Sequence, residues 1–241
     1  MLAIFRSELR KLLSVRSTYI VSALAILLVG FVAFYVVGYK GTGPDAYWLT
    51  HMIGNIASTV GVFISIVAIL LVGHEYRYNT IMYTLTSANS RTKVMLAKIG
   101  IALSYAMTLF AIAVVVGILA YIVGVAFSPN DANAVIKPLV YWADIWRAIY
   151  YVLGYGLLGL WLIFILRQLV GAIAAMFIIP TVESLVGILL KNNSKYLPVS
   201  ALENVQMQAL WSAGKSAALF AAYMATAWAI AWYVFLKRDA N

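Results

Sequence analysis

Hydrophobic and polar residues follow one another along this chain in long blocks. Six blocks stay apolar for about 20 residues or more, the length that a helix needs to cross the roughly 30 Å hydrocarbon core of a bilayer. Backbone groups find no water in lipid, so each block is predicted to be helical. The sequence therefore predicts an all-α integral membrane protein, one transmembrane domain over residues 1–241. Its six transmembrane helices are expected at residues 18–38, 52–73, 99–127, 145–166, 169–190 and 217–236.

The segment before the first block, residues 1–17, has a different pattern. Phe5, Leu9 and Leu12 recur at helical spacing, and Arg6 and Arg10 lie on the opposite face. A basic amphipathic helix of this kind lies in the membrane interface, where Arg and Lys meet anionic headgroups. We therefore predict an N-terminal interfacial helix that contacts membrane lipid.

The longest polar interruption is residues 74–98, between the second and third blocks. Asn79 is a suitable N-cap for a short helix that ends near residue 86. That helix would present Ile81, Met82 and Leu85 as an exposed apolar face. Met-rich apolar faces adapt to a protein partner, so this segment is predicted to dock onto one.

A second short helix is predicted in the loop before the last block. Ser200 and Glu203 form a capping box, and Leu202, Val205 and Leu210 share one face of the helix that would follow. We expect this amphipathic helix to lie at the outer membrane interface.

Composition supports a membrane protein and argues against a nucleic-acid partner. Of the 241 residues, 64% are hydrophobic and only 10% are charged, whereas soluble domains are about a quarter charged. The net charge of +9 comes from Lys and Arg residues that lie mostly between the apolar blocks. Such a distribution sets membrane orientation and does not form a nucleic-acid surface.

The Lys and Arg residues predict that both termini are cytoplasmic. With this orientation, the inner side holds most of the cations: Arg6, Arg10, Lys11, Arg16, Arg77, Arg91, Lys93, Lys98, Arg167, Lys237 and Arg238. The outer side holds fewer: Lys40, Lys137, Lys191, Lys195 and Lys215, with Arg147 near a boundary.

Together these features resemble the type-2 permease family of ATP-binding-cassette (ABC) exporters. The resemblance rests on the order and spacing of its motifs relative to the six blocks, and it covers essentially the whole chain. The motifs are Glu8–Tyr19, which resembles the elbow helix of the family, Glu75–Ser87 with Ser90–Lys98, and Leu197–Asn204 before the last block.

The resemblance implies a permease subunit of an ABC exporter in the cell membrane. Segment 74–98 would carry the coupling helix that docks onto a cytosolic ABC ATPase subunit, which would bind ATP and Mg²⁺. A second permease copy, identical or similar, would complete the assembly, with transport by alternating access. The residues assigned to coupling are Glu75, Arg77, Asn79, Ile81, Met82, Leu85 and Arg91.

The chain itself is predicted to have no ATP-binding site, enzymatic activity or cofactor. Gly214-Lys215-Ser216 resembles the end of a phosphate-binding loop, but Ala209 stands where that loop requires a glycine. There is no cysteine, and the two histidines, His51 and His74, are expected on opposite sides of the membrane. A histidine-based metal site or catalytic triad is therefore not expected.

Four polar residues within the apolar blocks are candidates for the transport pathway. Asn55, Ser58 and Thr59 fall on one face of the second block, and Glu183 is the only acidic residue deep within a block. An ionisable residue inside a membrane is a functional candidate by default. Glu183 has two interpretations: it lines the pathway, or it accepts hydrogen bonds from a neighbouring helix and fixes packing.

The alternative function is a stand-alone channel or ion-coupled carrier. Such proteins usually contain more charged or interrupted spans, or internal repeats. This chain has a single acid deep within a block and no convincing repeat.

The orientation can be tested because the chain contains no cysteine. Single cysteines at Asn89 and Asn193 should differ in their access to a membrane-impermeant thiol reagent in intact cells. We expect Asn193→Cys to be labelled and Asn89→Cys to be protected until the cells are opened. Equal labelling of both would contradict the six-helix topology.

Overall fold

The computed structural model describes residues 2–40, 47–81, 91–129, 138–139 and 141–237, with the side chains of residues 2 and 3 left aside. All regular elements in these ranges are helical. They are α1 (Leu2–Ser14), α2 (Arg16–Phe31) with a π-helical continuation (Val32–Tyr39), α3 (Trp48–Arg77), α5 (Arg91–Ala126), α6 (Trp142–Leu166), α7 (Leu169–Leu190) with a 3₁₀ continuation (Lys191–Tyr196), α8 (Pro198–Met207) and α9 (Ala213–Lys237).

The six predicted transmembrane helices are confirmed as helices that are long and apolar enough to cross a membrane. The bounds of α7 match the prediction at both ends, and α6 ends at the predicted Leu166. The helix α5 has 36 residues and begins at Arg91, eight residues before the predicted membrane-crossing block. Part of the predicted cytosolic segment is therefore a direct extension of this helix.

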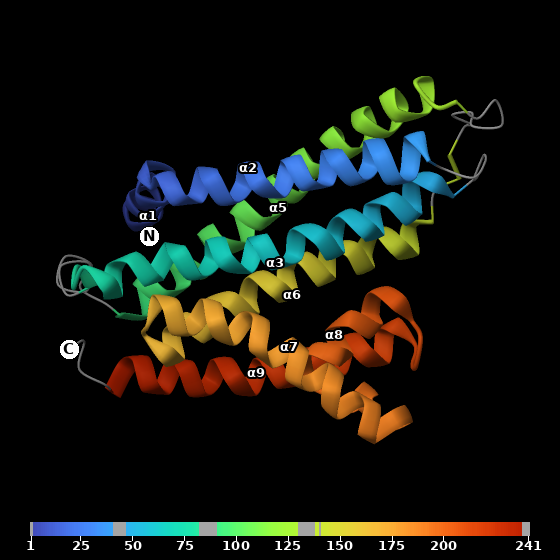
Figure 1. The fold of residues 1–241 in the computed structure, drawn as a ribbon. Helices are drawn as coiled ribbons and strands as arrows, with labels where there is room; N and C mark the ends of the chain where they lie inside the picture. Colours follow the sequence, from blue (N-terminus) through green and yellow to red (C-terminus); the bar gives the residue numbers. More distant parts are fainter. Residues whose placement is uncertain (1, 41–46, 82–90, 130–137, 140, 238–241) are drawn as a thin grey trace.

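The helices form an elongated bundle with two distinct ends (Figure 1). One end, called the α1 end here, contains α1, the C-terminal ends of α3 and α9 and the start of α5. The opposite end, called the α8 end, contains α8, the start of α3 and the start of α6. The beginning and the end of the described chain thus lie at the same end of the bundle.

The centre of the bundle is the pair of α3 and α6, which bury most of their apolar side chains. Gly159 lies directly against the backbone of Ser65, where a Cβ atom would collide with Ser65. Small residues at such crossings let helices approach closely in lipid. By contrast, α7 and α9 leave most of their surface uncovered by the rest of the described chain.

The predicted N-terminal helix is present as α1, and the chain turns sharply at Val15, which is extended, before α2 begins. Leu12 and Glu8 are buried against the bundle, whereas Arg6 and Arg10 are exposed. The amphipathic pattern is therefore realised, with the exception of the acidic Glu8 on the buried face.

The second short helix is present as α8, but its predicted cap was wrong. The helix begins at Pro198, two residues before Ser200, and ends at Met207, so Leu210 lies beyond it and is exposed. Proline at the first helical position needs no hydrogen-bond donor there, which favours this earlier start. Leu202 and Val205 are buried as α8 packs against α6, α7 and α9.

Candidate functional site

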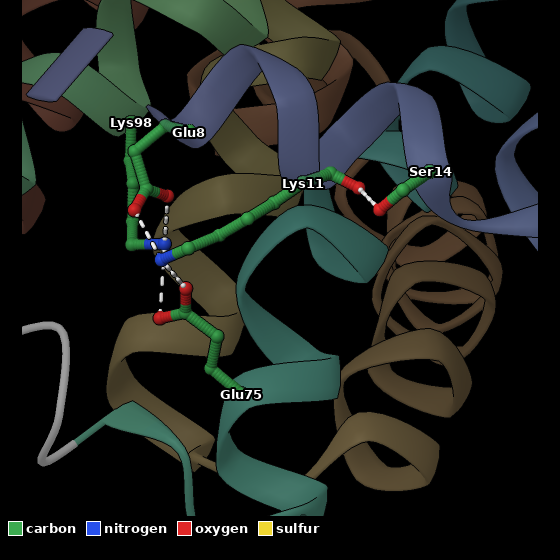
Figure 2. Close-up of polar contacts among 5 residues, drawn as sticks. All are labelled: Glu8, Lys11, Ser14, Glu75 and Lys98. Carbon is green, nitrogen blue, oxygen red and sulfur yellow. Dashed lines mark hydrogen bonds and ion pairs between the residues drawn. The ribbon is translucent and has the colours of Figure 1, made fainter. Parts of the chain in front are cut away.

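Four charged side chains from three helices meet at the α1 end and form the charge cluster of Glu8, Lys11, Glu75 and Lys98 (Figure 2). The Lys98 ammonium lies 2.5 Å from Glu8 Oε2 and 3.0 Å from Glu75 Oε2. The Lys11 ammonium lies 2.5 Å from Glu8 Oε1 and 2.7 Å from Glu75 Oε1. Each ammonium therefore bridges the same two carboxylates, and the ring of ion pairs is closed and formally neutral.

The charge cluster is largely removed from solvent. The side chains of Lys98 and Glu8 are 0% and 1% exposed, and Glu75 is also buried. Desolvating a charge is costly, and mutual attraction offsets this only when the geometry is good and the partners are complete. Each carboxylate contacts two ammonium groups, so every charge in the cluster has ionic partners.

The ion pairs shift the pKa values of Glu8 and Lys11 in directions that favour the charged forms. Burial raises the pKa of Glu8, but the positive charge of Lys98 and the contacts with Lys11 outweigh it and lower the pKa overall. Burial lowers the pKa of Lys11, but its hydrogen bonds to Glu75 and Glu8 outweigh it and raise the pKa overall. Both groups therefore stay charged around neutral pH.

The positions of these residues follow from the local sequence. Glu8 and Lys11 are one helical turn apart on α1, and Glu75 lies in the last turn of α3. Lys98 projects from α5 about two turns after the helix begins. Of these four residues, only Glu75 was predicted from the sequence to belong to a site. The available signal was Glu8, which falls on the same helical face as Phe5 and Leu12, where an acid needs a buried cation.

A cavity of about 500 Å³ lies beside the charge cluster, between α1, α2 and α3. Leu12, Leu70 and Leu71 give it an apolar wall, and Lys11 and Glu75 also line it. His74, which lines it as well, is held by Ser17, whose Oγ lies 3.1 Å from His74 Nε2. This arrangement couples the end of α3 to the start of α2.

The chain leaves α3 through a defined C-terminal motif, so the predicted role of Asn79 as the cap of a following helix was wrong. Asn79 has a φ of 54° and follows the end of α3. Its N–H donates to the Tyr76 carbonyl at 3.4 Å, and the N–H of Thr80 donates to the Glu75 carbonyl at 2.9 Å. This is a Schellman motif, and asparagine tolerates the left-handed conformation that it requires.

The other residues predicted to couple to the ATPase lie in different environments. Arg77 is exposed, with its guanidinium 5.7 Å from the centre of the Tyr78 ring. Ile81 is only 2% exposed and packs in the core, so the prediction that it contributes to an exposed apolar face was wrong. Met82 and Leu85 lie outside the described residues.

Arg91 connects two helices at the α1 end. Its Nη1 donates to the carbonyls of Phe235 and Leu236, at 3.2 and 3.1 Å, in the last turn of α9. A cation at a helix C-terminus satisfies carbonyl groups that lack helical partners and interacts favourably with the helix dipole. Arg91 therefore ties the start of α5 to the end of α9.

At the α8 end, two of the three polar residues predicted on α3 line a common cavity. Asn55 and Ser58 line a cavity of about 520 Å³, called the Asn55 cavity here. Asp144 and Arg147 of α6 and Gln206 of α8 also line it. Arg147 Nη1 donates to Asp144 Oδ1 at 2.6 Å. Thr59 is not part of this lining, and its hydroxyl donates to the Asn55 carbonyl at 2.9 Å.

Glu183 caps α8 and does not share the Asn55 cavity. Its carboxylate accepts hydrogen bonds from the N–H groups of Val199 and Ser200, each at 2.9 Å, and from the Ser200 hydroxyl at 3.3 Å. The first N–H groups of a helix have no partners within the helix, and an acid there also interacts favourably with the helix dipole. These are the hydrogen bonds that the packing interpretation of Glu183 requires.

A second acid, Glu203, which was predicted from the sequence only as part of a capping box, lies near Glu183. Glu203 of α8 lines the same cavity of about 440 Å³ as Glu183. Burial and, to a smaller extent, the negative charge of Glu183 raise the pKa of Glu203. Met207 lines both this cavity and the Asn55 cavity, so the two spaces meet near the end of α8.

The chemistry of these sites is that of charge pairing and hydrogen bonding. Over the residues that the structure describes, no group of three or more His, Asp or Glu side chains is placed to hold a metal ion. No protein-family model matches this chain, and no curated protein matches its sequence.

We expect Lys98→Met to destabilise the protein by about 3–5 kcal/mol, because it leaves the buried carboxylates of Glu8 and Glu75 with one shared cation. Unfolding of the purified protein in detergent would measure the loss. Lys93→Met, an exposed lysine on the same helix, is the matched control. The double variant Glu8→Gln/Lys98→Met should recover much of the loss, since it removes one charge of each sign. A Lys98→Met variant as stable as Lys93→Met would contradict this account.

For Glu183, the hydrogen bonds predict a loss of stability. Glu183→Ala removes the acceptor of two helix N–H groups and should lower the free energy of unfolding by about 1–3 kcal/mol. Glu183→Gln keeps one acceptor oxygen and should lose less. Thermal unfolding and transport should be measured on the same preparation. Altered transport by Glu183→Gln at unchanged stability would instead place Glu183 in the pathway.

Proposed function

We propose that this chain is the transmembrane permease subunit of an ABC exporter and works with a separate cytosolic ATPase subunit. The observation that carries the proposal is the charge cluster. It fastens the end of α3 and the beginning of α5, which flank the segment that resembles a coupling helix, to the N-terminal helix α1. Such an attachment is what a permease needs in order to convert movement of a short cytosolic segment into movement of its helices.

The mechanism follows from the stiffness of this attachment. When the partner ATPase closes on ATP and Mg²⁺, it would push the segment between α3 and α5. Separating the charge cluster would leave charges buried without partners, so α1, α3 and α5 would move together. The central position of α3 against α6 would carry this movement to the α8 end, where the Asn55 cavity lies.

Placement in the cell membrane, with both termini in the cytoplasm, is part of the same proposal. Six membrane-crossing helices with the first and last described elements at one end agree with an even number of crossings (Figure 1). The exposed Arg6 and Arg10 of α1 would then face anionic headgroups of the inner leaflet. The α1 end would be the cytoplasmic end.

We further propose that a second permease copy, identical or similar, completes the assembly. The support is the surface of α7, where most large apolar side chains are exposed. Lipid or another helix can cover such a surface in a membrane. The exposed residues of α7 include Phe177, Ile178, Val182, Leu185, Ile188 and Leu189.

The proposed contact with the ATPase can be tested by purification of the permease from its native host. The ATPase subunit should co-purify with the natural chain and be lost from a Met82→Asp/Leu85→Asp variant, because charge in a docking surface that excludes water weakens binding strongly. Transport should fall in parallel, while the permease itself still inserts.

Leu139→Asp is the matched control, since Leu139 is an exposed apolar residue beside the start of α3, where its carbonyl accepts from the Thr50 hydroxyl at 3.4 Å. The control should retain the ATPase. Absence of any co-purifying ATPase would contradict the proposed function. If the Met82→Asp/Leu85→Asp variant retained the ATPase, the docking surface would have to lie elsewhere at the α1 end.

A further inference from the structure

The Asn55 cavity is an unusually polar place in a predominantly apolar chain. It is lined by Asn55, Ser58, Asp144, Arg147 and Gln206, from α3, α6 and α8, and its volume of about 520 Å³ lies in the range of small-molecule sites. Polar groups inside a membrane protein are expensive unless they are used. The lining of this cavity therefore calls for a ligand with polar groups.

The charges of the lining define what kind of polar ligand fits. Asp144 and Arg147 pair with each other at 2.6 Å, so their charges cancel, and His51 is the other titratable residue in the lining. Both side chains are partly shielded from solvent, which makes an added net charge costly. A ligand group without net charge is favoured over an acid or an amine.

The hydrogen-bonding capacity of the lining is only partly used by the protein. The Asn55 carboxamide makes no hydrogen bond within the described ranges. Among the residues that the structure describes, Gln206 Oε1 and Arg147 Nε are buried and have no hydrogen-bond partner. Asn55 is exposed and available to a ligand, whereas a buried polar atom without a partner is costly, so a ligand toward which Gln206 and Arg147 can turn removes that cost.

We propose that this cavity binds an uncharged amide group, such as the backbone of a peptide, between Asn55 of α3 and Gln206 of α8. A carboxamide offers one acceptor and N–H donors, which complement the carbonyl and N–H of a ligand amide. The ligand would thereby join α8 to α3. This inference rests on the proposed transport function, because it names the chemical class that the permease would bind at its α8 end.

The position of Gln206 provides a steric test. A Cβ atom on Gly54 would lie 2.7 Å from Gln206 Nε2, so Gly54→Ala forces this carboxamide to move without changing any charge. Gly214 is the matched control, since a Cβ atom there would meet nothing within 4 Å. Gln168→Leu, at an exposed position directly before α7 and outside the cavity lining, is the control for Gln206→Leu.

Binding should be measured by calorimetry on the full chain in lipid nanodiscs, without the ATPase. Three probes share one skeleton: N-acetyl-alanyl-alanine amide is neutral, alanyl-alanine amide is cationic and N-acetyl-alanyl-alanine is anionic. We expect the neutral probe to bind about tenfold more tightly than either charged probe. Asn55→Leu and Gln206→Leu should each weaken it by about tenfold, the effect of about one hydrogen bond. Gly54→Ala should weaken it as well, whereas Gly214→Ala and Gln168→Leu should not.

The inference is overturned if the neutral probe does not bind, if a charged probe binds equally well, or if neither Asn55→Leu nor Gln206→Leu weakens binding. Because the assay contains no ATPase, its result is separate from that of the co-purification experiment. Failure of this assay alone would remove the amide site and leave the proposed permease function in place.

Discussion

The structure depends most on the charge cluster, because separation of the helices there would leave several charges buried without partners. Glu8 and Lys98 are almost completely buried, and each needs the other. The ion pair between Glu75 of α3 and Lys11 of α1 completes the ring of ion pairs. The cluster thus fixes α1 against two membrane-crossing helices at the α1 end, where the proposed ATPase would act. An apolar replacement of similar volume would avoid the desolvation cost of the cluster, whereas removal of a single partner would leave a buried charge unpaired.

The α8 end is organised by hydrogen bonds to helix termini and by carboxamides. Glu183 holds the start of α8 from α7. At the end of α8, Asn204 donates to the Ser216 hydroxyl at 2.6 Å and accepts from the Leu210 N–H at 2.8 Å, which ties the following turn to α9. With its backbone secured in this way, α8 contributes to the lining of two cavities. A ligand between Asn55 and Gln206 would therefore act on an element that is held firmly by α7 and α9.

The proposed mechanism links these two ends through the pair of α3 and α6. Glu75 of the charge cluster and Asn55 of the cavity both belong to α3, which is continuous from Trp48 to Arg77. Close approach at Gly159 and Ser65 leaves little room for α3 and α6 to slide past each other. Movement imposed at the α1 end is therefore expected to reach the cavity as a shift of the whole helix.

The sequence alone determined the six long helices, because a bilayer demands about 20 apolar residues and a helical backbone, and both conditions are local. It also determined α1, through the spacing of Phe5, Leu9 and Leu12. Only the tertiary structure decided what the buried polar residues contact. Glu8 and Lys98 are 90 residues apart, and Glu183 satisfies N–H groups at the start of a helix that carries no capping side chain of its own. Local patterns favoured Asn79 and Ser200 as N-caps. Instead, Asn79 belongs to the Schellman motif that ends α3, and α8 begins at Pro198 with Glu183 as the acceptor for its first N–H groups. The physical reason is that a hydrophobic period specifies which face is buried, whereas a hydrogen bond or an ion pair depends on which distant helix the fold brings within reach.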